Sequence, residues 1–274
     1  MAVSEPTRTA VRTWDPQQYR RYGGERSRPF YDLTSQIEAI DPRSVVDIGC
    51  GPGELTASLA RRWPQADVLG IDSSPEMIEA AQRVLEAEDT GPGDPPRLRF
   101  ELMELHDWCP TEPVDVIVSN AVLQWLPDRE SLMLRFAGHL AEGGWLAVQM
   151  PANYGQDAHR LMHGLIGSAK WQPRLAEVQL AWQSGDPGPY LDLLANAGYM
   201  VDAWETTYLH VLPGDDPVLD WLKGTGLRPV LAALDQADRE EFLAEYGALL
   251  RDAYPRHEYG TVLPFRRLFV VARR

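Results

Sequence analysis

The stretch DIGCGPG at residues 47–53 decides the fold, because it stands between a short apolar run and a helix-like stretch. A strand, a glycine loop and a helix in this order are the context that a nucleotide-binding loop requires. Gly49 and Gly51 have no Cβ, so the backbone can turn sharply there and a bulky ligand can lie against it. The third glycine of the dinucleotide fingerprint is replaced by Glu54, whose carboxylate would repel a pyrophosphate. The loop therefore favours a ligand without phosphate groups.

Short β-branched runs alternate with longer amphipathic stretches on both sides of this loop, which is typical of repeated βαβ units. Ser74 can cap a helix whose first residue is Pro75. Strands are predicted at residues 45–48, 68–71, 98–102, 114–119 and 145–150, and helices at 54–63, 75–87 and 128–141. Beyond residue 150 the sequence predicts a strand at 201–209, a helical insertion over 216–254 and a final strand at 265–271.

This pattern predicts an α/β fold with a Rossmann-like, mostly parallel seven-stranded sheet, flanking helices and a helical cap inserted between the last two strands. We expect one domain over residues 1–274, with an N-terminal helical flap at 1–43 and a cofactor-binding core at 44–150. The acceptor half would span 151–274, with the cap at about 213–260.

Composition excludes several classes of function. The net charge of −14 argues against a nucleic-acid partner, because such proteins neutralise phosphates with Lys and Arg. No apolar run has the length of a membrane span, and the N-terminus lacks the apolar stretch of a signal peptide, so we expect a cytoplasmic protein without a membrane partner. Two cysteines form neither a disulfide framework nor a metal motif.

A second signal is Asp72, which closes the predicted second strand in the motif GID. A carboxylate at this place can accept hydrogen bonds from both ribose hydroxyls of an adenosine. Glu54 is compatible with S-adenosylmethionine, which carries a sulfonium and an ammonium but no phosphate. We expect Asp47 to orient the glycine loop and to reach the amino-acid end of this cofactor.

At these residues the chain resembles the class I methyltransferases, on the motifs DIGCGPG, GID and VDVIVSNAVLQWLPD. The resemblance implies that Asp72 binds ribose, that Met103 and Glu104 lie beside adenine, and that Asn120 follows the fourth strand at the methionine end. Glu104 stands where an Asp is more usual. The predicted cofactor-binding residues are Asp47, Gly49, Cys50, Gly51, Asp72, Ser73, Met77, Met103, Glu104, Asn120, Ala121 and Trp125.

Four longer strings narrow the resemblance: WDPQQYRRYGGERSRP, NAVLQW, KGTGLRP and LPFRRLFVVA. They are similar to the family of trans-aconitate 2-methyltransferases, over nearly the whole chain. The resemblance implies methyl transfer to a carboxylate of this small tricarboxylate, giving a monomethyl ester, and we expect a monomer. The predicted substrate-binding residues are Tyr19, Arg26, Gln124, Lys223, Arg228 and Arg266.

The chemistry requires few catalytic groups. A carboxylate is already ionised at neutral pH, so no general base and no catalytic residue are expected. Several cations must hold a tricarboxylate, and only one of Arg266 and Arg267 can face a pocket, because neighbouring strand residues point to opposite faces. His159 and His163 share the spacing of one helical face, but no third ligand is evident and no metal is predicted.

Three alternatives stay open. The same fold could methylate another small carboxylic acid or a hydroxylated metabolite. A nicotinamide-dependent oxidoreductase is disfavoured by Glu54. A module that only senses S-adenosylmethionine is disfavoured by the predicted cap and its cations.

Overall fold

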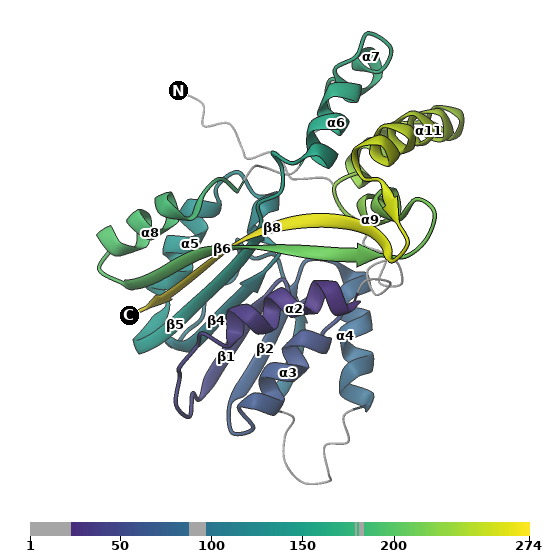
Figure 1. Cartoon of the computed structure of the whole chain (residues 1–274). Coiled ribbons are helices and arrows are strands. Elements are labelled where there is room, and N and C mark those ends of the chain that lie inside the picture. The colour runs from purple at the N-terminus through teal and green to yellow at the C-terminus, as the bar shows by residue number, and fades with distance from the viewer. Residues whose placement is uncertain (1–22, 88–96, 179, 181–183) are drawn as a thin grey trace, which may run out of the picture.

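The computed structural model describes residues 23–87, 97–178, 180 and 184–274. The first half is a series of strand and helix units, shown in Figure 1. All pairings among the strands of this half are parallel. The elements are β1 (Ser44–Ile48), α3 (Glu54–Arg62), β2 (Asp67–Asp72), α4 (Pro75–Ala87), β3 (Leu98–Leu102), β4 (Val114–Asn120), the short 3-10 helix η1 (Leu123–Trp125), α5 (Arg129–Gly138) and β5 (Leu140–Pro151).

The predicted elements agree with these bounds, apart from their ends. Helix α4 begins at Pro75 as predicted, and the hydroxyl of Ser74 accepts from the backbone N–H of Met77 at 3.3 Å. Strand β5 begins earlier than predicted, because Leu140 already pairs with Val114 of β4. For the same reason α5 ends before the predicted residue 141.

The second half adds an antiparallel edge to the sheet. Its elements are α6 (Asp157–Ile166), α7 (Gln172–Leu175), α8 (Pro187–Asn196), β6 (Met200–Leu212), α9 (Pro217–Lys223), α10 (Arg228–Ala233), α11 (Gln236–Ala253), β7 (Arg256–His257) and β8 (Gly260–Arg273). The strand order is β3-β2-β1-β4-β5-β8-β6, and β8 runs antiparallel to both its neighbours. The predicted path of seven strands is confirmed, and the two-residue β7 adds an eighth strand beside β8.

Helices cover both faces of this sheet. On one face, α2 (Gly23–Thr34) packs with α3 and α4, and Phe30 of α2 shares a core with Ala57 of α3. On the other face, Phe136 of α5 and Leu194 of α8 share a second core. Arg62 holds the end of α2, because its guanidinium donates to the carbonyl oxygen of Thr34 at 2.5 Å.

Strands β6 and β8 are longer than the rest of the sheet. β5 pairs with β8 only as far as Pro151, opposite Arg267, whereas β6 continues to Leu212, opposite Thr261. The long pair therefore projects past the carboxyl edge of the parallel strands and reaches α9 (Figure 1). That edge is where open α/β sheets bind their ligands.

The helical cap lies over this projecting pair. As predicted, α9, α10 and α11 are inserted between β6 and β8. Their apolar core also contains Met162 of α6 and Trp171, which precedes α7. The helical cover therefore includes α6 and α7, which lie outside the expected range of 213–260. Within the described residues, no helix combines the length and apolar character needed to cross a membrane.

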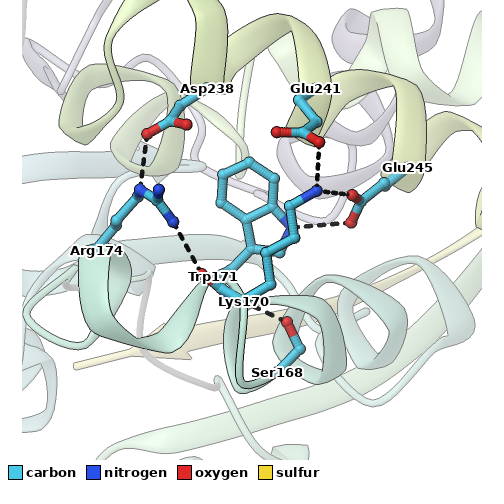
Figure 2. Close-up of polar contacts among 7 residues, drawn as sticks. All are labelled: Ser168, Lys170, Trp171, Arg174, Asp238, Glu241 and Glu245. Atoms are coloured by element: carbon cyan, nitrogen blue, oxygen red, sulfur yellow. Dashed lines mark hydrogen bonds and ion pairs between the residues drawn. The ribbon is translucent and has the colours of Figure 1, made fainter.

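Polar contacts tie α7 and the two residues before it to α11, as Figure 2 shows. Lys170 contacts Glu241 at 2.6 Å and also Glu245, and Arg174 contacts Asp238 at 2.9 Å. The indole N–H of the buried Trp171 donates to Glu245 at 2.9 Å. These contacts hold the two pieces of the cap together across a long separation in sequence.

Candidate active site

The glycine loop turns between β1 and α3 through three left-handed residues. Gly49, Gly51 and Gly53 have φ angles of 76°, 56° and 88°, which side chains with a Cβ rarely adopt. The backbone N–H of Gly49 donates to the carbonyl oxygen of Ile71 at 2.8 Å, which fixes the loop against β2. A Cβ at Gly49 would lie 2.2 Å from Val122, whereas a Cβ at Gly51 would meet nothing within 4 Å. Gly51 thus faces open space that a ligand can fill.

Asp47 ends up buried beneath this loop. The hydroxyl of Thr56 donates to its carboxylate at 2.6 Å. Burial raises the pKa of Asp47 to about 7, the Thr56 hydrogen bond opposes this shift, and the nearby carboxylate of Asp72 adds to it. A cationic ligand beside Asp47 would stabilise its ionised form.

Asp72 lies at the end of β2, against the glycine loop. Its carboxylate accepts from the backbone N–H of Gly51 at 2.9 Å and from that of Ser74 at 2.9 Å. Burial raises the pKa of Asp72, these hydrogen bonds lower it, and the carboxylate of Glu104 raises it further. The structure therefore brings Asp72 and Glu104 together, as the ribose and adenine assignments require.

The neighbouring predicted residues complete this side of the site. The backbone N–H of Met103 donates to the carbonyl oxygen of Asp72 at 2.9 Å, which places Met103 at the same edge. Met77 is buried in α4, and Ser73 is exposed beside Asp72. Cys50 is buried, and burial, together with the carboxylates of Asp47 and Asp72, raises the pKa of its thiol. The thiol of Cys50 is therefore kept protonated in the loop.

The end of β4 carries the residues predicted for the methionine end of the cofactor. Ala121 has a φ of 59°, a strained angle for a residue with a Cβ, and its N–H donates to the carbonyl oxygen of Gln149 at 2.9 Å. The side-chain amide of Gln124 donates to the carbonyl oxygen of Ala121 at 2.6 Å. Among the described residues, the buried oxygens Asn120 Oδ1 and Gln124 Oε1 have no hydrogen-bond partner. Trp125 is half-buried at the end of η1.

The residues predicted to bind the acceptor come from segments that are farther apart in the sequence than those of the cofactor side. Tyr19 and the side chain of Arg26 lie outside the described residues. Lys223 contacts Asp220 at 3.2 Å, and Arg228 begins α10. The loop between them packs on α6, because a Cβ at Gly226 would lie 3.0 Å from the ring of His159.

The histidine pair is divided between the interior and the surface. His159 is buried, with its ring centroid 4.8 Å from that of Tyr154, and burial lowers its pKa to about 4. His163 is exposed. Among the described residues, no three His, Cys, Asp or Glu side chains form a group able to hold a metal ion.

Arg266, which was predicted to contact the acceptor, is already paired with carboxylates. Its guanidinium pairs with Asp186 at 2.6 Å and with Glu205, and these carboxylates raise its pKa. Its neighbour Arg267 points to the opposite face, is 4% exposed, and donates to Oε1 of Gln149 at 3.3 Å. Arg267 is therefore the arginine that faces inward. Arg266 faces the other side of the sheet, where two carboxylates neutralise it.

Three buried polar residues beside Arg267 were not predicted from the sequence. These are Gln149 on β5 and Tyr208 and His210 on β6. Gln149 had a visible signal, because it interrupts an otherwise apolar strand. Tyr208 and His210 had none, because alternating polar residues on an edge strand ordinarily face solvent.

Comparison with known proteins agrees with this geometry. The model of the methyltransferase domain family matches residues 19–204. A trans-aconitate 2-methyltransferase of Streptomyces avermitilis is 48% identical over 96% of this chain and 97% of its own.

Two solved structures share the fold. The YcgJ protein of Bacillus subtilis has a TM-score of 0.57 and 14% identity, covering 88% of this chain and 96% of its own. Phosphoethanolamine N-methyltransferase 2 of Haemonchus contortus, solved with S-adenosylhomocysteine, has a TM-score of 0.54 and 15% identity over 90% of this chain and 52% of its own. The methyltransferase prediction is thereby confirmed over the oxidoreductase alternative, and the chain belongs to the family of trans-aconitate 2-methyltransferases.

Proposed function

We propose that this protein transfers a methyl group from S-adenosylmethionine to a carboxylate of trans-aconitate, giving a monomethyl ester. The observation that carries the proposal is family membership over nearly the whole chain, at 48% identity to a relative with this named activity. When bound, S-adenosylmethionine supplies a methyl group on a sulfonium, which a nucleophile can displace.

The residues at the carboxyl ends of β1 to β4, together with the glycine loop, fit this cofactor. Asp47, Asp72 and Glu104 put carboxylates at the ends of β1, β2 and β3, which suits a ligand with two cationic groups and two ribose hydroxyls. Gly51 leaves space for it, and the unpartnered Asn120 Oδ1 can accept from its ammonium. We assign Asp72 to the ribose and Asp47 and Asn120 to the methionine end.

The chain has little chemistry to perform beyond positioning. The acceptor carboxylate is ionised at neutral pH, so no general base is needed. Orientation of the two reactants and exclusion of water are then the main contributions. The cap formed by α6, α7 and α9 to α11 lies where it can cover the acceptor.

Cationic side chains are proposed to hold the acceptor. Lys223 and Arg228 flank the loop that packs on His159, and we keep them, with Gln124, Tyr19 and Arg26, as proposed acceptor contacts. A substrate with three negative charges requires local cations in a chain of net charge −14.

We also infer a cytoplasmic monomer that does not bind nucleic acid. The net charge of −14 disfavours a polyanion. The free thiols of Cys50 and Cys109, the second of them exposed, suit a reducing compartment.

The test is methyl transfer to a panel of tricarboxylic, dicarboxylic and hydroxylated acids, with the ester identified by mass spectrometry. We expect trans-aconitate to be the best acceptor by kcat/KM, and chelators to leave its rate unchanged. Faster transfer to another acid, or to a hydroxyl group, would replace trans-aconitate as the acceptor. Binding of S-adenosylmethionine without transfer to any acceptor would favour a sensing module.

A further inference from the structure

Charges are divided between the two ends of the candidate site. The carboxylates of Asp47, Asp72 and Glu104 lie at the ends of β1 to β3, where the cofactor is assigned. On the far side of β4 and β5, the buried Arg267 of β8 supplies positive charge. Arg28 of α2 lies on the same side, with its guanidinium 5.1 Å from the centre of the Tyr208 ring. One end of the site thus suits a cation and the other suits an anion.

Arg267 lies at the point where β5 ends and β8 continues beside β6 alone. It lies opposite Pro151, the last residue of β5 that pairs with β8. Its guanidinium lies 4.6 Å from the centre of the Phe265 ring and donates to Oε1 of Gln149. Phe265 and Gln149 therefore hold the guanidinium at the carboxyl edge of the parallel strands, beside the cofactor end of β4.

Two neighbouring amides have one unsatisfied atom each. Gln149 is fully buried and its Nε2 donor has no partner among the described residues, although its Oε1 accepts from Arg267. Asn120 lies beside Gln149 in the register of β4 and β5, and its Oδ1 acceptor is also without a partner. Buried polar atoms without partners are costly, so such atoms point to a ligand. Gln149 therefore has an unused donor close to its contact with Arg267, and Asn120 has an unused acceptor at the end of β4.

We propose that Arg267 and the side-chain amide of Gln149 bind a carboxylate of the acceptor that is not methylated, and thereby select polycarboxylic acids. The inference rests on the proposed function. The Arg267 guanidinium and the Gln149 Nε2 donor would grip one carboxylate group, and another carboxylate of the same molecule would face the methyl group near Asn120. Arg267 is a specificity-determining residue in this arrangement, and it takes the role expected of Arg266.

The aromatic residues beside Arg267 add no competing charge. His210 is buried, and burial, together with Arg267 and Arg28, lowers its pKa to about 4, so its ring is neutral at neutral pH. Tyr208 donates its hydroxyl to Asp32 at 2.7 Å, and burial raises the pKa of that hydroxyl. The carboxylate of Asp32 is thus partnered by Tyr208 and, at 3.6 Å, by Arg28.

The test compares Arg267→Met with the matched control Arg266→Met, whose guanidinium is paired on the outer face. For each protein, KM is measured for trans-aconitate and for an analogue that keeps only one carboxylate, and calorimetry gives the Kd of S-adenosylhomocysteine. We expect Arg267→Met to raise KM for trans-aconitate by at least about 30-fold, the lower range for removing one partner of a buried charge pair. The KM for the analogue and the cofactor Kd should change little, and Arg266→Met should behave like the wild type.

Gln149→Leu is the second variant, because it removes the amide at nearly constant volume and keeps the test usable if Arg267→Met does not fold. It should raise KM for trans-aconitate more than for the analogue. Unchanged KM in a folded Arg267→Met protein, or equal losses for both acids, would overturn the proposal.

A binding measurement separates this inference from the proposed function. If the wild type does not methylate trans-aconitate, the proposed function fails, but the anion site is still tested by titrating trans-aconitate into protein saturated with S-adenosylhomocysteine. Binding that Arg267→Met abolishes and Arg266→Met preserves would support the site, and equal binding by both variants would refute it.

Discussion

One carboxylate oxygen of Asp72 accepts a hydrogen bond from the backbone N–H of Gly51 at 2.9 Å. The residue assigned to the ribose is therefore also the residue that holds the glycine loop against the end of β2. Its second oxygen accepts from Ser74 and ties in the start of α4. A single side chain thus links the glycine loop, the end of β2 and the start of α4.

Asp72→Asn should weaken binding of S-adenosylhomocysteine by about 10- to 150-fold, because hydrogen bonds to a charged group contribute about 1.5–3 kcal/mol. Calorimetry measures the loss, and circular dichroism establishes that the variant is folded. Asp67→Asn, at the exposed start of β2, is the control and should bind normally. Unchanged affinity in folded Asp72→Asn would refute the ribose assignment.

The titration of Asp47 should make the stability of the cofactor-free protein depend on pH. The pKa is about 7 in the folded state against an ordinary value of 3.8, so the folded state binds more protons between these values. Stability should therefore fall as the pH rises through this range, and Asp47→Asn should remove that part of the decline. Urea unfolding at several pH values measures the slope. Thr56→Val is a useful companion, since loss of its hydrogen bond should shift the decline to higher pH.

Gly49→Ala and Gly51→Ala should differ in their effects. Both require a left-handed alanine, which costs about 1–2 kcal/mol. Gly49→Ala also forces a Cβ against Val122, which adds about 1–3 kcal/mol, and the second change Val122→Ala should recover part of this loss. Gly51→Ala should instead reduce cofactor affinity. Thermal unfolding compares the variants, with Gly138→Ala as a control that meets no atom within 4 Å. Equal stability of the two variants would contradict the role of Val122.

The hydrogen bond between Trp171 and Glu245 should contribute more to the stability of the cap than the ion pairs around it. Glu245→Gln keeps an acceptor for the buried indole N–H, whereas Glu245→Ala leaves that donor unsatisfied, at a cost of about 1–3 kcal/mol. Glu241→Gln removes only an exposed contact with Lys170 and should change stability little (Figure 2). Chemical unfolding ranks the three variants, and a loss in Glu241→Gln as large as in Glu245→Ala would contradict this ranking.

Local patterns were enough to predict the class of fold and to predict that the residues proposed for the cofactor gather at one edge of the sheet. The DIGCGPG loop, the Ser74 cap with Pro75 and the carboxylate at the end of β2 each depend on residues close together in the chain. Parallel strands then bring Asp47, Asp72, Glu104 and Asn120 to one edge, because that edge is where all their carboxyl ends meet.

The acceptor half depends on contacts that are distant in the sequence. Alternation along β8 showed that Arg266 and Arg267 face opposite sides, but not which of them faces inward. The answer depends on the pairing of β8 with β5 and β6, which places Arg267 beside Gln149 and Arg266 beside Glu205. In the same way, the sequence alone determined that a helical cap follows β6, whereas tertiary packing decided that Trp171 would join α11. Helix and strand propensities depend on residues close together in the chain, so they do not indicate such long-range partners. Only burial of the shared apolar core selects these partners.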